Sequence, residues 1–290
     1  MSKQWLCDGD MFVNEQGNLV SIKREEYWGC ESPRTYNDWT QFYVWSRDWM
    51  SPDDCELWCG DKMGRRVPSM WEVLEDFIDY GAFYDDEYDE KTTEWMTDLE
   101  NMGTINDYIP EMCDWLNEHG CYALPISVSG YYDVTYSADL RYDRNCTGYD
   151  GIIFMTEEGR EKVGTPLHLV PSLFDDECKV FSDWCNSNIF GYVEFDKLGN
   201  EVDSCCGFIG DDSVGAIEYY TGELSDCDFS SVSEYVAAHK DDPDVLVARY
   251  NEARNELNDM TETLKKMLKN IVDVRKLDVR FVDERLVLEA

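Results

Sequence analysis

The sequence predicts an α+β fold. It has an acidic Trp-rich N-terminal region with helices, a central antiparallel β region, and a C-terminal heptad helix followed by a β-hairpin. Three observations support this prediction. Helical apolar spacing is concentrated in residues 69–120, strand-like segments dominate residues 121–230, and apolar residues recur at steps of four and three after Pro243. We therefore expect three regions: an acidic aromatic-rich α+β region over 1–120, an antiparallel β-rich domain over 121–240, and an assembly helix with a hairpin over 241–290.

The N-terminal region begins with strands and loops and continues as helices. Residues 11–13 and 19–22 read as a hairpin whose turn contains Gly17 and Asn18, residue types that tolerate positive φ. Ser69 is a predicted N-cap, and Glu72 three residues later completes a capping box. Two more helices are predicted over 92–102 and 108–119. The apolar face of the first helix comprises Trp71, Leu74, Phe77, Ile78 and Phe83.

The central region is predicted to be mainly β. Strands are expected at residues 126–128, 131–136 and 152–155, and a short helix over 173–186. The clearest hairpin joins residues 190–195 to residues 201–208 through a turn at 196–200. Cys205 and Cys206 are adjacent in this hairpin, and we interpret them as strand residues that point to opposite faces.

The C-terminal region opens with a helix start signal, Asp242 followed by Pro243. A strand pair is predicted at 278–282 and 286–288. The helix seam has a 3.5-residue period and comprises Leu246, Tyr250, Ala253, Leu257, Met260, Leu264, Met267 and Ile271. Six of these, all but Ala253 and Met267, are our predicted oligomerisation residues. The seam favours a homo-oligomer, while packing of the helix within its own domain is the alternative.

The charge of the chain is distributed unevenly. Residues 1–248 contain 16 basic and 53 acidic residues, which accounts for the net charge of −37, whereas residues 249–290 contain nine of each. Such a charge destabilises the compact state through self-repulsion. A basic partner, a divalent cation or a salty habitat would offset that cost. The forty aromatic residues indicate a folded chain rather than an acidic disordered tail.

The densest acidic block lies between residues 70 and 118, with 16 acidic residues against one lysine, Lys91. A solvated face is the alternative interpretation, but mixed charges serve solubility better. We predict a binding surface for a basic partner, anchored by interleaved aromatics (Trp71, Phe77, Tyr80, Phe83, Tyr84, Tyr88 and Trp95). The predicted partner-binding residues are Asp79, Asp85, Asp86, Glu87, Tyr88, Asp89, Glu90 and Glu94.

Composition also bounds location and chemistry. The first residues lack a secretory signal, no apolar run is long enough to cross a bilayer, and twelve cysteines then indicate reduced thiols in a cytoplasm. Direct binding to nucleic acid or to an anionic membrane is not expected. Three histidines and the absence of hydrolase motifs argue against an enzyme, so we predict no catalytic residue, no cofactor and no metal. The alternative is a metal-dependent enzyme, a hydrolase or deaminase, that uses the cluster of Cys113, His119 and Cys121.

Three segments, LPISVSGYYDVTYS, CTGYDGIIFMTEEGREKVG and FGYVEFDKLGNEVDSCCGFIG, resemble parts of small uncharacterised proteins of phages and plasmids. The resemblance covers residues 121–212. Those relatives have an Asp-His-Ser-Gly stretch where this chain has SGYY at 129–132, so no role of that histidine is carried over.

Extreme acidity combined with an assembly helix resembles phage anti-defence proteins, among them inhibitors of the Gabija system. That resemblance implies a non-enzymatic inhibitor in the host bacterial cytoplasm. It would bind a host defence nuclease–helicase complex and block its access to DNA. A DNA-mimic anti-restriction or anti-CRISPR protein is the alternative, and a salt-adapted enzyme ranks last.

Overall fold

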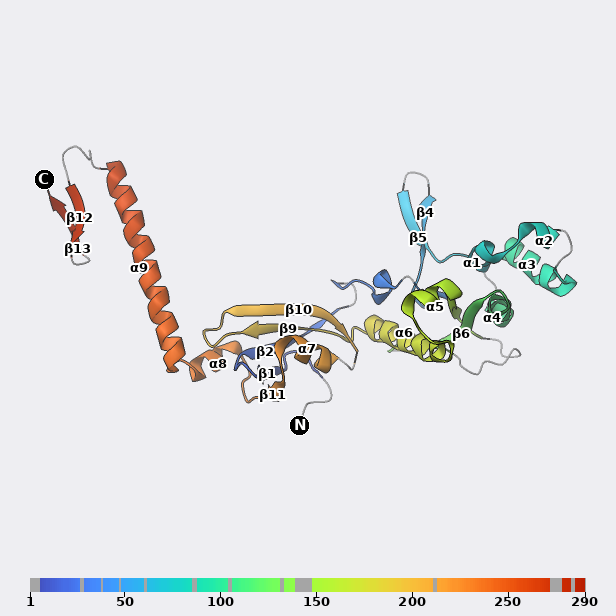
Figure 1. The fold of residues 1–290 in the computed structure, drawn as a ribbon, viewed down its shortest axis with the longest axis horizontal. Helices are drawn as coiled ribbons and strands as arrows, with labels where there is room; N and C mark the ends of the chain where they lie inside the picture. Colours follow the sequence, from blue (N-terminus) through green and yellow to red (C-terminus); the bar gives the residue numbers. More distant parts are fainter. Residues whose placement is uncertain are drawn as a thin grey trace. The chain divides into compact units, whose positions relative to one another are not determined.

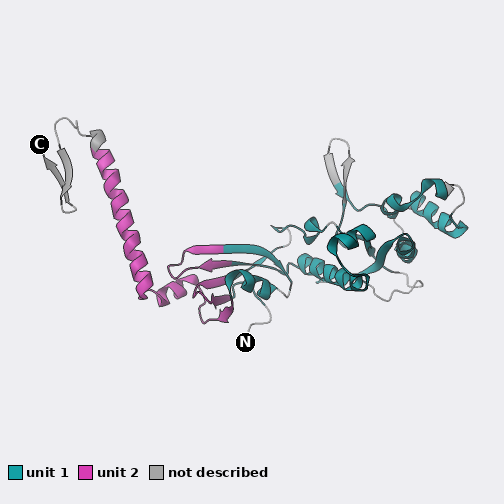
Figure 2. Cartoon of the chain, viewed as in Figure 1, with its two compact units in different colours: residues 1–10, 22–192, 204–222 teal, residues 11–21, 193–203, 223–290 magenta. Residues whose placement is uncertain are grey.

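The computed structural model describes residues 6–26, 29–37, 39–46, 48–59, 62–84, 88–103, 106–130, 133–138, 148–210, 213–271, 278–282 and 285–289. The fold is α+β, as predicted, and every strand pair whose register is defined is antiparallel. The chain forms two compact units (Figure 2): residues 1–10, 22–192 and 204–222, and residues 11–21, 193–203 and 223–290.

The strands are β1 (Met11–Asn14), β2 (Leu19–Glu25), β3 (Gln41–Val44), β4 (Cys55–Cys59), β5 (Lys62–Arg66), β6 (Cys121–Ser129), β7 (Thr135–Ala138), β8 (Gly151–Thr156), β9 (Ile189–Phe195), β10 (Glu201–Ile209), β11 (Leu224–Asp226), β12 (Asp278–Val282) and β13 (Arg285–Glu289). The helices are α1 (Met70–Leu74), α2 (Tyr80–Tyr84), α3 (Glu90–Met102), α4 (Ile109–Glu118), α5 (Glu157–Val163), α6 (Val170–Cys185), α7 (Ser213–Thr221), α8 (Val232–Ala238) and α9 (Pro243–Ile271), with 3₁₀ turns η2 (Pro33–Tyr36), η3 (Glu75–Phe77), η4 (Asn106–Tyr108) and η5 (Leu167–Leu169). Figure 1 labels most of these elements.

A four-stranded sheet of order β3-β8-β6-β7 organises the first unit. Its central strand β8 buries side chains on both faces, because Ile153 and Met155 contribute to one hydrophobic cluster while Ile152 and Phe154 contribute to another. Two-sided burial explains why the sequence of β8 is a continuous apolar run. Gly151 begins β8 where an added Cβ would lie 2.0 Å from the Tyr43 carbonyl oxygen, so this position requires glycine.

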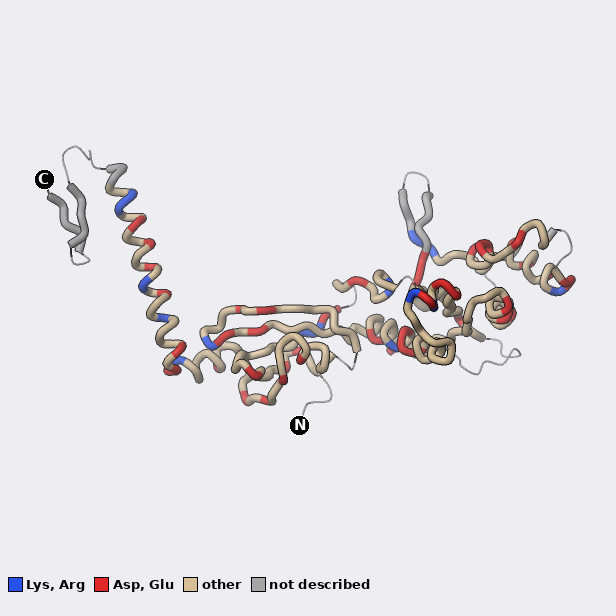
Figure 3. The backbone as a smooth tube through the Cα atoms, viewed as in Figure 1, with Lys and Arg blue, Asp and Glu red and all other residues tan. Residues whose placement is uncertain are grey.

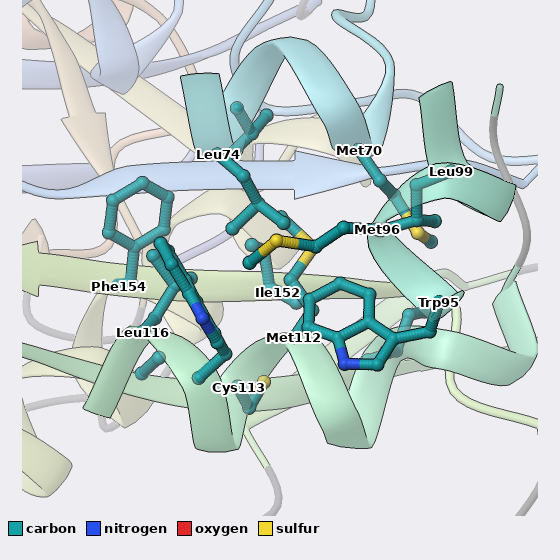
Figure 4. Close-up of a cluster of buried hydrophobic side chains, with 14 of the residues drawn as sticks. Met70, Leu74, Trp95, Met96, Leu99, Met112, Cys113, Leu116, Ile152 and Phe154 are labelled. Atoms are coloured by element: carbon teal, nitrogen blue, oxygen red, sulfur yellow. The ribbon is translucent and has the colours of Figure 1, made fainter. Parts of the chain in front are cut away.

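Helices cover both faces of this sheet. On one face, α6 contributes Phe174, Cys178 and Phe181 to a cluster with residues of β3, β6 and β8. On the other face, α1, α3 and α4 pack together over β8 (Figure 4), where Leu74, Met96 and other residues of these helices point toward one another. One side of α3 therefore packs against this second cluster.

The second sheet has the order β10-β9-β2-β1-β11. The predicted hairpin of β1 and β2 is confirmed, with Met11 opposite Ser21 and Val13 opposite Leu19. Its turn is held by Asn14, whose Oδ1 accepts from the Asn18 amide at 2.9 Å and whose Nδ2 donates to Glu194 at 2.9 Å. The terminal hairpin of β12 and β13 and the helix α9 are also present as predicted.

Two helical predictions differ from the structure. The capping box at Ser69 and Glu72 is formed, but the helix that it starts is only five residues long. The chain continues as η3, becomes extended at Ile78, and starts again as α2 after Asp79, whose Oδ1 accepts from the Gly81 amide at 2.9 Å. The next helix, predicted from residue 92, begins at Glu90 because Asp89 is its N-cap.

The three predicted regions do not coincide with the two compact units. One hydrophobic cluster joins residues of α1, α3 and α4 to Ala123, Ile152 and Phe154, so residues on both sides of position 120 share a core. A change from helical to strand-like sequence therefore marks a change of element here and not a domain boundary.

Candidate functional site: the acidic face of helix α3

Helix α3 lies within the acidic block, and its orientation is determined by its buried side. Trp95, Met96 and Leu99 are at most 7% exposed and belong to the core cluster. Residues four apart lie on one face of an α-helix, so Glu90, Glu94 and Asp98 form a row on another face. Glu90 and Glu94 are exposed, and Asp98 is partly exposed. We call these three residues the α3 acidic row.

A surface pocket of about 520 Å³ follows the row. Its lining comprises Tyr88, Glu90, Thr93, Glu94, Thr97 and Asp98. The Thr97 hydroxyl donates to the Thr93 carbonyl oxygen at 2.7 Å, so it is engaged within the helix. The Tyr108 hydroxyl donates to Asp98 Oδ2 at 3.0 Å, and this hydrogen bond raises the pKa of Tyr108. The carboxylates of the row are therefore the charged groups that this pocket offers to a partner.

The charge of the row is uncompensated among the residues that the structure describes, since none of the ion pairs found there involves Glu90, Glu94 or Asp98. Acidic residues recur along the tube of α3 (Figure 3), and Lys91 is the one base between residues 70 and 118. Like charges four residues apart destabilise a helix by about 0.2–0.5 kcal/mol per pair. The like-charge pairs of the row thus have a cost in stability that no ion pair among the described residues offsets.

The other predicted binding residues have mostly structural roles. Asp79 caps α2, and its amide donates to the Tyr88 hydroxyl oxygen at 3.3 Å. Asp89 Oδ1 accepts from the amides of Lys91 and Thr92, both at 3.0 Å, and hydrogen bonds from Thr92 lower the pKa of Asp89. The predicted residues Asp85, Asp86 and Glu87 lie outside the described residues.

The predicted aromatic anchors are largely core residues. Phe83 is 5% exposed and Trp95 is 7% exposed, so the prediction that they anchor a partner is wrong. Trp71, Phe77 and Tyr88 are partly buried against the same cluster, whereas Tyr80 is 40% exposed. The side chain of Tyr84 lies outside the described set. Aromatics at helical spacing belong to the buried face here, which leaves carboxylates and threonines on the outer one.

Sequence reasoning missed Thr93, Thr97 and Asp98 as lining residues. The signal for Asp98 was present, because it follows Glu94 by four residues just as Glu94 follows Glu90. The threonines lacked any such signal, since their place depends on which side of α3 packs against the core.

The predicted oligomerisation residues lie on α9. The side chains of Leu246, Tyr250, Leu257, Met260 and Leu264 are 50–66% exposed. The backbone of Ile271 ends the helix, and its side chain is outside the described set. The alternative interpretation was that this seam packs within its own domain. The exposure of these five side chains shows that they do not pack in that way.

The cysteine–histidine cluster does not converge on one point. Cys113 is buried in the core, where burial raises the pKa of its thiol well above the ordinary value. The His119 ring stacks on Trp115 with centroids 3.7 Å apart, and its Nδ1 lies 2.8 Å from the Trp115 carbonyl oxygen. Burial raises the pKa of Cys121 to about 11. Within the described part of the chain, no three His, Cys, Asp or Glu side chains come together as metal ligands would.

Comparisons with protein-family models, curated proteins and solved structures found no match to this chain. Across the described residues, the helices are too short or too polar to cross a lipid bilayer.

Proposed function

We propose that this protein is a non-enzymatic inhibitor that binds a DNA-handling nuclease–helicase complex of bacterial antiviral defence and blocks its access to DNA. The observation that carries the proposal is the α3 acidic row, which lines a pocket, exposes Glu90 and Glu94, and has no ion-pair partner among the described residues. A DNA-binding surface is basic, so its charge is complementary to this row.

The charge distribution supports electrostatic attraction between the two proteins. A net charge of −37 attracts a basic surface over a range set by ionic strength, which raises the association rate. Once bound, the inhibitor covers the basic surface that DNA would otherwise contact. Binding should therefore weaken as salt is added.

The cost of the row to the stability of α3 is a second argument for a binding role. Two like-charge pairs, Glu90 with Glu94 and Glu94 with Asp98, weaken the helix that carries them. Features that violate local stability rules are expected at functional sites. A binding role accounts for a row that folding alone would not favour.

The spacing of the row favours occlusion over close mimicry of a duplex. Four residues of α-helix rise about 6 Å, so the row presents one charge per about 6 Å. Duplex DNA carries one charge per about 1.7 Å of its axis. The DNA-mimic alternative would need several acidic segments aligned together, whereas an occluding inhibitor needs only one complementary patch.

The test uses bacteria that carry a Gabija system and are challenged with a phage that the system restricts. Expression of the protein should restore plaque formation. The variant Glu90→Gln/Glu94→Gln/Asp98→Asn should reduce that restoration at least about tenfold, because each lost charge contact weakens binding. The matched control Glu223→Gln/Asp226→Asn/Asp228→Asn removes three exposed charges elsewhere and should retain full activity.

Equal loss in both triple variants would show that net charge matters and the row does not. Absence of any rescue by the wild-type protein would reject Gabija as the target. Where the wild-type protein does rescue the phage, its co-purification with the Gabija complex is measured at two salt concentrations. Co-purification at 0.1 M salt that is lost at 0.5 M salt would indicate an electrostatic complex rather than a hydrophobic one.

A further inference from the structure

The seam of α9 is an apolar surface on a helix that is exposed nearly all round. Every residue from Arg249 to Met260 is exposed. The seam side chains with the highest exposed fraction are Tyr250 at 66% and Met260 at 64%. An isolated helix with one apolar stripe gains stability mainly by packing that stripe. The 3.5-residue period is that of a left-handed coiled coil.

We infer that α9 is a dimerisation helix that pairs with α9 of a second copy in the antiparallel direction. The seam positions are symmetric about a point between Asn258 and Asp259. Antiparallel pairing about that point forms complete layers: position 246 with 271, 250 with 267, 253 with 264, and 257 with 260. The inference does not depend on the proposed function.

Side-chain volume favours this direction. In the antiparallel pair, the small Ala253 faces the larger Leu264 of the second copy, and Tyr250 faces Met267. In a parallel pair, Ala253 would face its own copy and leave a gap, while two Tyr250 rings would meet. Alternation of large and small residues across facing positions fills an interface better.

The residues that flank the seam favour the same direction. In a parallel pair, Arg249 would face Arg254 of the second copy at two equivalent places. In the antiparallel pair, Arg254 faces Thr261, and Val247 faces Leu268, which widens the apolar contact. A parallel pair would therefore contain the like-charge contact between Arg249 and Arg254, and an antiparallel pair avoids it.

The charge of the remaining chain also favours the antiparallel direction. Residues 1–248 carry the whole net charge of −37, and they precede the body of α9, so they attach at its N-terminal end. α9 itself carries both signs of charge (Figure 3). Antiparallel pairing separates the two N-terminal ends by about 40 Å, the length of the helix. Parallel pairing would bring them to about 10 Å, near the Debye length of about 8 Å at physiological salt.

The interface is tested on the purified full-length protein by analytical ultracentrifugation. We expect a dimer, and we expect Leu257→Lys/Met260→Lys to raise its dissociation constant at least roughly a hundredfold, because the pair would bury unpaired ammonium groups. Asn255→Lys adds the same kind of charge on the opposite side of the helix and should leave the dimer intact. Unchanged circular dichroism in both variants establishes that they fold. A wild-type monomer, or a seam variant that still dimerises, would overturn the inference.

The direction is tested by Thr261→Glu. In the antiparallel dimer the new carboxylate faces Arg254 of the second copy at two places. The dissociation constant of the dimer should therefore fall by roughly two- to thirtyfold. In a parallel dimer it would face Glu256 and weaken the pair. Asn255→Glu is the charge-matched control and should change the dissociation constant little. Weakening by Thr261→Glu beyond that control would reject antiparallel pairing.

Discussion

At the scale of single residues, Arg34 shows how a buried charge is stabilised in an acidic protein. Its Nε and Nη2 donate to the two oxygens of Asp53, each at 2.8 Å. Its Nη1 donates to Glu177 of α6 and, at 3.0 Å, to Thr40 Oγ1. Burial alone would lower the pKa of Arg34, but the hydrogen bond and charge of Asp53, together with those of Glu177, raise it. The guanidinium thus holds η2 to α6.

Replacement of Arg34 by Ala should lower the free energy of unfolding by about 3–5 kcal/mol, because two largely buried carboxylates lose their partner. Chemical denaturation followed by circular dichroism measures this. Arg160→Ala breaks an ion pair whose Glu157 side chain is 62% exposed, and it should change stability far less. Similar losses in the two variants would contradict the structural role of Arg34.

The thiols should differ in reactivity according to burial. Cys205 and Cys206 lie in the strand β10, as predicted, and both are exposed. Cys113 and Cys178 are buried, and burial raises their thiol pKa, so little thiolate forms at pH 8. Iodoacetamide labelling at pH 8 with peptide mass spectrometry should modify the exposed pair first and the buried pair only in urea. Rapid native labelling of Cys113 would refute its placement in the core.

At the scale of elements, some boundaries that depend on neighbours in sequence were predicted, although the start of α3 at the Asp89 cap was missed. The Ser69 capping box and the Asn14–Asn18 hydrogen bond of the β1–β2 turn are contacts within a few residues, and both are present. The continuation of the first helix was not predictable from its apolar spacing. Asp79 competes by capping a new helix, and the short helices α1 and α2 are held by packing on the core rather than by length.

At the scale of the whole molecule, self-repulsion should make stability depend on salt. The Debye length falls from about 30 Å at 0.01 M to about 3 Å at 1 M salt, so added salt screens the repulsion that a charge of −37 causes. We expect the melting temperature to rise by about 5 °C between 0.01 and 0.5 M NaCl. Differential scanning fluorimetry measures it.

The variant Glu90→Gln/Glu94→Gln/Asp98→Asn provides the comparison, since it removes two like-charge pairs from α3. It should melt at a higher temperature than the wild type in 0.01 M NaCl and gain less from added salt. A melting temperature that falls as salt is added would show that attractive ion pairs, rather than repulsion, dominate the electrostatics.

The sequence by itself determined the features that local chemistry controls: the α+β class, the hairpins, the caps, the heptad seam of α9 and the location of the net charge. Tertiary structure alone decided which side of each element is buried. It placed Phe83 and Trp95 in the core and left Glu90 and Glu94 outside, and it joined Arg34 to Glu177 across 143 residues. The physical reason is that caps and turns form between near neighbours, whereas burial depends on packing partners that are distant in the chain.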